Sequence, residues 1–115
     1  MNLDFESRFR DCIKKIDTIG GQYAQAKAQS WQLQELKGSI LASIMKSLGE
    51  MPVSKAELLA KTSDDYKNHI IGTAAAIQKE LELKAQYEKW KCSFEALRSL
   101  CSLEKSTQKE IGNET

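Results

Sequence analysis

The sequence is poor in residues that interrupt helices and in apolar runs that span membranes. Proline occurs once in 115 residues and glycine six times, so few positions can break a helix. No run of about 18 apolar residues is present, which argues against a transmembrane helix. With 29 % charged and only 7 % aromatic residues, this composition favours a helix-rich soluble protein over a sheet protein.

Residues that carry chemistry are also scarce. The single histidine, His69, has no second histidine and no cysteine pair at the spacing that metal ligands require. The glycine pair at 20–21 lacks the preceding strand and the following Lys-Ser/Thr of a phosphate-binding loop. We therefore expect no catalytic residue, no metal, no cofactor and no enzymatic activity.

Cysteine usage and the first residues bear on the compartment. Cys12, Cys92 and Cys101 are odd in number and form no Cys-x-x-Cys motif, so we expect reduced thiols in a cytoplasmic protein. The first twelve residues contain acids and no apolar core segment, unlike a secretion signal. The net charge is +1, so only a local cluster of charge could predict an anionic partner.

The first half of the chain has the apolar spacing of one long helix. Apolar residues follow alternating steps of four and three from residue 5 to residue 26 without a slip. This phase crosses Gly20-Gly21, the weakest point of the prediction, because each glycine costs about 1 kcal/mol in a helix interior. Gly49 and Pro52 should end the helix. We predict a helix over 4–48, with a stripe of Phe5, Phe9, Cys12, Ile16, Ile19, Tyr23, Ala26, Leu33, Leu36, Ile40, Ile44 and Leu48.

The second half predicts another long helix over 64–110. At roughly 1.5 Å per residue it would be about 70 Å long, which suits a coiled coil better than a compact domain. Its expected stripe is Tyr66, Ile70, Ala74, Ile77, Leu81, Tyr87, Trp90, Phe94, Leu97 and Cys101. Between the long helices, Ser54 and Glu57 have the spacing of a capping box and predict a short helix over 54–61. Thr62, Ser63 and Asp64 offer a second N-cap.

These elements predict an all-α fold, a long antiparallel helical hairpin of coiled-coil type with a short connecting helix. We expect a single domain over 1–111 and a frayed tail over 112–115. Residues that pack together should have numbers adding to roughly 120, which would bring Trp31 near Trp90 and Ile44 near Ile77. Further apolar residues flank the stripes, so we expect a second seam and a homo-oligomer. These residues are Ile13, Leu41, Met45, Ile71, Leu83, Leu100 and Leu103.

A row of basic residues at intervals of seven marks one flank of the second helix. The candidate nucleic-acid-binding residues are Lys84, Lys89, Trp90, Lys91, Arg98 and Lys105. Cations at a seven-residue interval form a strip that phosphates can follow, and Trp90 could stack on an unpaired base. Two simpler interpretations stand beside this one. The row can be a solvated coiled-coil flank, and Trp90 can be a packing residue, because it has the core phase.

Residues 87–100, YEKWKCSFEALRSL, resemble the C-terminal part of a group of short bacteriophage proteins with the pattern Tyr-Glu-x-Trp-Lys-x-x-Phe-Glu-Ala-x-Arg-Ser. Residues 53–57 and 64–66 also resemble that group. In helical make-up these proteins look like the phage recombination-mediator family, oligomers that bind single-stranded DNA and help to load a recombinase. The resemblance covers residues 53–105. It implies a role in DNA recombination in a bacterial host cell, with a recombinase as a further partner, and it carries over to Trp90, Lys91 and Arg98.

A second class of function stays open. A structural adaptor or assembly scaffold would use the same helical hairpin only for contacts between proteins. The two classes differ in one measurable property, which is binding of short single-stranded oligonucleotides at low salt.

Overall fold

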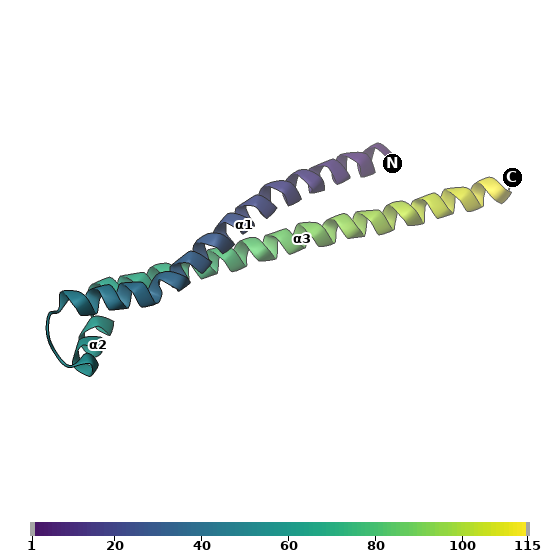
Figure 1. Ribbon diagram of the computed structural model, residues 1–115. Helices are drawn as coiled ribbons and strands as arrows, with labels where there is room; N and C mark the ends of the chain where they lie inside the picture. The colour runs from purple at the N-terminus through teal and green to yellow at the C-terminus, as the bar shows by residue number, and fades with distance from the viewer. Residues whose placement is uncertain (1, 115) are drawn as a thin grey trace. The chain divides into compact units, whose positions relative to one another are not determined.

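The computed structural model describes the backbone of residues 2–114 and the side chains of residues 4–111. It contains three helices, α1 (Asn2–Ser47), α2 (Val53–Lys61) and α3 (Asp64–Glu114), and no strand in the described range (Figure 1). The long helix α1 packs against the long helix α3. The all-α fold, the helical hairpin and the short connecting helix are thereby confirmed.

The chain divides into two compact units. Unit 1 consists of Met1–Tyr23 with Leu83–Thr115, and unit 2 consists of Ala24–Glu82. Each unit pairs a segment of α1 with a segment of α3, and unit 2 also contains α2. The side chains of residues 112–115, the predicted tail, lie outside the described residues. The tail and the single domain over 1–111 therefore stay predictions.

In unit 1 an aromatic seam joins the two helices. The rings of Phe9 and Phe94 meet edge to face with centroids 5.4 Å apart, and those of Tyr23 and Tyr87 lie 6.0 Å apart. Higher numbers in α1 thus pair with lower numbers in α3, which makes the pairing antiparallel. Leu97 is 8 % exposed in the same seam. Such aromatic pairs contribute about 0.5–1.5 kcal/mol beyond their buried area.

The glycine pair does not break α1, which continues from Asn2 to Ser47. At Gly20 an added Cβ would lie 3.2 Å from Cε2 of Tyr87, whereas at Gly21 nothing lies within 4 Å. The first glycine therefore lets the Tyr87 ring approach the backbone of α1 closely. The helix ends before Gly49, whose φ of 85° is readily adopted only by a residue without Cβ.

In unit 2 polar contacts join the helices beside half-buried apolar side chains of α1, among them Leu33, Ile40 and Ile44. Ser30 is fully buried, and it accepts a hydrogen bond from Nε2 of Gln34 at 3.0 Å on its hydroxyl. Nε2 of His69 lies 2.9 Å from the carbonyl oxygen of Leu33, where it donates a hydrogen bond across the helices. The neutral tautomer with the proton on Nε2 satisfies this contact.

The phase of this seam corrects the sequence prediction for the first part of α3. The half-buried positions are Tyr66, His69, Thr73, Ala76, Glu80 and Leu83, and of the predicted stripe Ile77 joins them. By contrast, Ile70 is 39 % and Leu81 56 % exposed. The predicted stripe runs to Leu81 and resumes at Tyr87, a step of six residues that one helix face cannot contain. The structure keeps the phase of Tyr87 and leaves the stripe of Ile70 and Leu81 outside the seam.

The predicted register is also wrong. Trp90 lies beside Lys15 rather than Trp31, which is 64 % exposed. In unit 2, Leu33 pairs with His69. Leu33 stands about four turns before the end of α1, whereas His69 stands little more than one turn after the start of α3. The last turns of α1 therefore run past the start of α3, and the two helix ends are not aligned.

The connecting segment differs in one detail from the prediction. The amide of Ala56 donates to the carbonyl of Pro52 at 3.0 Å, so α2 begins at Val53, and no side chain caps it. Ser54 is already inside the first turn, and the predicted capping box is wrong. The N-cap at Ser63 is confirmed, because its hydroxyl accepts a hydrogen bond from the amide of Tyr66 at 3.3 Å.

Candidate nucleic-acid interface

Four cations of the basic row lie on α3 within unit 1. Lys84, Lys91, Arg98 and Lys105 are all exposed. Residues seven apart stand two helical turns apart on one face, so the row is continuous along the helix, with about 10.5 Å between successive positions. We call this set the basic row.

The basic row has few acidic partners. Arg98 pairs with Glu95 at 3.3 Å, and both side chains are more than 60 % exposed, so the pair contributes little and is screened by salt. Each of the four ion pairs among the described residues joins two residues of the same helix, and none joins two helices. No ion pair within that part of the chain engages Lys84, Lys91 or Lys105. The cations do not hold the hairpin together.

Two members of the basic row also touch the aromatic seam. Nζ of Lys91 lies 5.3 Å from the centroid of the Tyr87 ring, a cation–π contact. Lys105 lines a shallow groove together with Phe9 and Glu6. Both lysines are nevertheless exposed, so their ammonium groups stay in water and keep their charge available.

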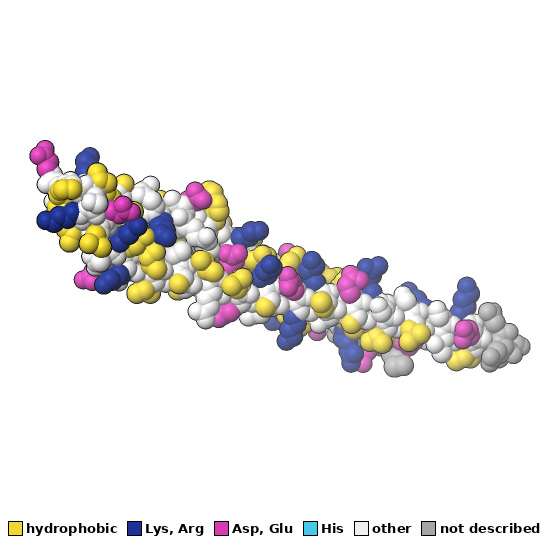
Figure 2. All heavy atoms as spheres, turned by 90° about the horizontal axis from the view of Figure 1, so that it is seen from below, with side chains coloured by type: hydrophobic (Ala, Val, Ile, Leu, Met, Phe, Trp, Pro, Cys, Tyr) yellow, Lys and Arg dark blue, Asp and Glu magenta, His cyan; other side chains and the backbone are white. Residues whose placement is uncertain are grey.

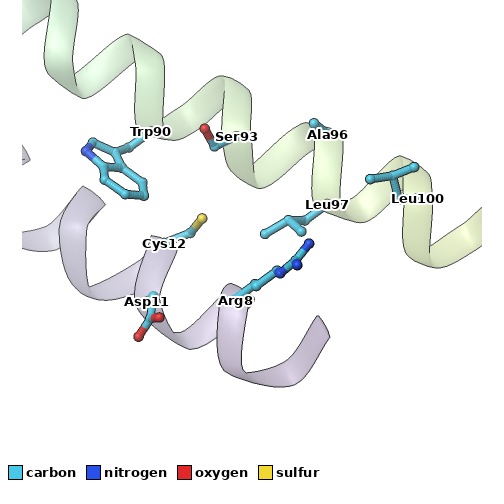
Figure 3. Close-up of a pocket in the computed structure, with 8 residues that line it drawn as sticks. All are labelled: Arg8, Asp11, Cys12, Trp90, Ser93, Ala96, Leu97 and Leu100. Carbon is cyan, nitrogen blue, oxygen red and sulfur yellow. The ribbon is translucent and has the colours of Figure 1, made fainter. Parts of the chain in front are cut away.

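The other two candidate residues lie on a different flank. Lys89 precedes Lys91 by two positions, and residues two apart do not share a helix face. Trp90 is half-buried and lines a second groove, where Figure 3 shows its indole directed toward Cys12 of α1. The structure therefore groups the basic row and separates Lys89 and Trp90 from it.

The groove beside Trp90 has an apolar floor and a charged rim. In Figure 3, Leu97 points from α3 toward α1, and the side chain of Arg8 extends along the groove toward Leu97. Its volume is about 390 Å³. Nζ of Lys15 lies 6.0 Å from the centroid of the Trp90 ring. The eight lining residues are Arg8, Asp11, Cys12, Trp90, Ser93, Ala96, Leu97 and Leu100.

Sequence reasoning missed Arg8 and Lys15 as neighbours of Trp90. A signal for them exists in α1, because both stand one position before a residue of the apolar stripe, Phe9 and Ile16. Residues at that position flank the seam in a coiled coil. The incorrect register hid this, because it placed Trp90 opposite Trp31.

The described residues hold no cluster of three His, Cys, Asp or Glu side chains that could bind a metal ion. Of the three thiols, Cys12 is buried, Cys101 is half-buried and Cys92 is exposed. In the described part of the chain, no helix has the length and hydropathy needed to cross a membrane.

The shifted pKa values belong to two residues of α2, outside the basic row. A hydrogen bond from Lys61, 2.8 Å away, lowers the pKa of Glu57, and the positive charge of Lys61 adds to the effect. The same hydrogen bond, with the charge of Glu57, raises the pKa of Lys61. This exposed pair supports the helix at i,i+4 spacing and marks no reactive group.

Comparison of the chain with protein-family models, with curated proteins and with solved structures gives no match.

Proposed function

We propose that this protein is a non-enzymatic accessory of DNA recombination that binds single-stranded DNA along the basic row. In this proposal it acts as a homo-oligomer in the cytoplasm of a bacterial host, in the manner of a phage recombination mediator, with a recombinase as a further partner. One observation carries the binding proposal. Four cations share a flank of α3, all are exposed, and only Arg98 is ion-paired among the described residues.

The physical support is local charge on a nearly neutral chain. Because the net charge is only +1, the whole molecule attracts DNA weakly, and a strip of cations supplies the attraction. Each neutralised phosphate of a single strand contributes about 0.7 to the slope of log K against log salt. Glu88 and Glu95 reduce the local potential, so one copy of the strip binds modestly. Repetition in an oligomer raises the overall affinity through effective concentration.

Lys89 and Trp90 enter the proposal as a separate contact. A base that stacks on Trp90 would occupy the groove beside Cys12, displace Lys15 from the ring, and gain about 1–3 kcal/mol. The backbone contact along the basic row does not require it.

The test is equilibrium binding of a fluorescent single-stranded oligonucleotide, measured by anisotropy at several salt concentrations. The parent should bind at low salt. Lys91→Glu with Arg98→Glu should reduce the affinity by at least about tenfold and lower the salt slope by about 1.4, the value for two phosphate contacts. The matched control, Lys37→Glu with Lys67→Glu, makes the same charge change in unit 2 and should bind more tightly than the row variant.

The competing function is a scaffold that makes protein contacts only. The specific observation in its favour is the exposure of large apolar side chains in both units, among them Trp31 at 64 % and Leu103 at 65 %. Absence of oligonucleotide binding by the parent at low salt would establish the scaffold in place of the DNA-binding function. Sedimentation at micromolar concentration tests the oligomer separately.

A further inference from the structure

In unit 2, an apolar stripe of α3 has most of its large side chains exposed. Ile70, Ala74, Ile77 and Leu81 follow steps of four, three and four, the spacing by which one helix packs on another. Ile77 is half-buried, but Ile70 is 39 %, Leu81 56 % and the neighbouring Ile71 66 % exposed. We call Ile70, Ala74, Ile77 and Leu81 the outer stripe.

The outer stripe borders a groove between α1 and α3 of unit 2. Its lining residues are Gln34, Lys37, Ile70, Thr73, Ala74 and Ile77, and its volume is about 420 Å³. A groove between two antiparallel helices, with an apolar stripe on one wall, has the form that receives a third helix. Figure 2 shows hydrophobic side chains, cations and acids interspersed on the visible face of the helices.

The charges around the groove select the partner. The lining includes one cation, Lys37, and no acid, and Lys67 continues the outer stripe by one step toward the start of α3. Neither lysine takes part in an ion pair of the described residues. The acids Glu35 on α1 and Glu80 and Glu82 on α3 do not line the groove. A groove lined by apolar side chains and one lysine complements an apolar stripe bounded by acids.

A second copy of the outer stripe fits this charge pattern poorly. In a parallel pair of stripes, each Lys67 would meet its own equivalent. In an antiparallel pair that matches the apolar residues, Lys67 would meet position 84, which is also lysine. Like charges placed opposite each other oppose association, so both self-pairings are disfavoured.

We infer that the outer stripe of unit 2 is a docking site for an amphipathic helix of a partner protein, one with an apolar stripe flanked by Asp or Glu. This inference is independent of the nucleic-acid interface, because it uses other residues and another class of ligand. The partner helix would cover Ile70 and Ile77 and place its acids beside Lys37 and Lys67.

The experiment uses the full chain and two synthetic helical peptides of about four turns, labelled for fluorescence anisotropy. Both peptides carry the same leucine stripe, one with Glu and the other with Lys at the flanking positions. The Glu peptide should bind at least about tenfold more tightly than the Lys peptide. Ile70→Ser with Ile77→Ser should weaken the Glu peptide by at least about tenfold, and Lys37→Glu with Lys67→Glu should reverse the preference.

Leu103→Ser is the matched control, because Leu103 is an apolar residue of α3 that is 65 % exposed and belongs to unit 1. It should leave peptide binding unchanged. Equal binding of both peptides, equal loss in the Leu103 variant, or no peptide binding by the parent would overturn the inference. Dissociation of an oligomer by the Ile70 and Ile77 substitutions would show that a second copy occupies the stripe instead. Circular dichroism of the same variants shows whether a loss of peptide binding is due to misfolding. Their oligonucleotide binding shows separately whether the DNA-binding function holds.

Discussion

Units 1 and 2 use the same two helices to build different seams. The seam of unit 1 contains two aromatic pairs, Phe9 with Phe94 and Tyr23 with Tyr87. The seam of unit 2 contains the buried Ser30 and a hydrogen bond from His69 to the carbonyl of Leu33. Large side chains gain more from burial than small polar ones, at about 25 cal/mol per Å² of apolar area, so single substitutions should cost more in the seam of unit 1.

The flank of α3 beside the seam also differs between the two units, apolar in unit 2 and cationic in unit 1. At intervals of seven, α3 carries Ile70 and Ile77 in unit 2 and then Lys84, Lys91 and the other members of the basic row. One helix flank thus changes from apolar to cationic between the two units. This contrast underlies the two proposals, that unit 2 binds an amphipathic helix and that unit 1 binds a polyanion.

The largest expected effect on stability lies in the seam of unit 1. Leu97→Ala removes a side chain that is 8 % exposed and should lower the free energy of unfolding by about 3 kcal/mol, through lost burial and a cavity. Urea denaturation followed by circular dichroism measures the change. Leu100→Ala, at a residue that is 51 % exposed, is the control and should cost much less. Equal losses would mean that unit 1 has no dominant core.

A smaller effect is expected in the seam of unit 2. His69→Ala removes the 2.9 Å hydrogen bond to Leu33 and should cost about 1 kcal/mol, the usual net value of such a bond. Amide hydrogen exchange in the two units should show faster opening of unit 2 than in the parent, with unit 1 unchanged. A loss as large as that of Leu97→Ala would contradict the contrast between the two seams.

The glycine pair provides a comparison within unit 1. Gly21→Ala should raise stability by about 0.5–1 kcal/mol, because alanine favours the helix and nothing lies within 4 Å of the new Cβ. Gly20→Ala should gain less or lose, because its Cβ would lie 3.2 Å from the Tyr87 ring. The midpoint temperatures of thermal unfolding rank the stabilities of the two variants. A larger gain at Gly20 would show that the ring moves away without cost.

The smallest effect concerns the Glu57–Lys61 pair in unit 2. The pKa of Glu57 is lowered from 4.5, so its support of α2 is present above that pH and is lost as the pH falls through the lowered value. The pKa of Lys61 is raised from 10.5, so its contribution is lost only as the pH rises through the raised value. Carbon-13 NMR titration of Glu57 should show a higher pKa in Lys61→Met. An unchanged pKa of Glu57 would show that Lys61 does not stabilise its carboxylate.

Much of the fold follows from the sequence because its signals are local. Unbroken steps of four and three from Phe5 to Ala26 predicted one helix across Gly20-Gly21, and Gly49 with Pro52 predicted its end. Helix packing requires such spacing wherever a long helix buries one face. The exposure of the basic row also follows from its position beside the stripe.

The remaining features depend on contacts that no local pattern contains. The start of α2 depends on the carbonyl of Pro52, not on the side chain of Ser54. The register depends on how far α1 runs past the start of α3. The seam of α3 depends on a competition between two phases, and the stripe of Ile70 and Leu81 is the more apolar in its own segment. The phase that includes Tyr87 and Leu97 is the one observed, and it matches the α1 stripe of unit 1.

A crossed binding experiment tests whether the two units bind different classes of partner. Two double variants, Lys91→Glu with Arg98→Glu and Ile70→Ser with Ile77→Ser, are each titrated with the single-stranded oligonucleotide and with the acidic helical peptide. The first variant should lose affinity only for the oligonucleotide and the second only for the peptide, each by at least about tenfold. Loss of both ligands by either variant, or of neither ligand by both variants, would overturn the assignment of one partner class to each unit.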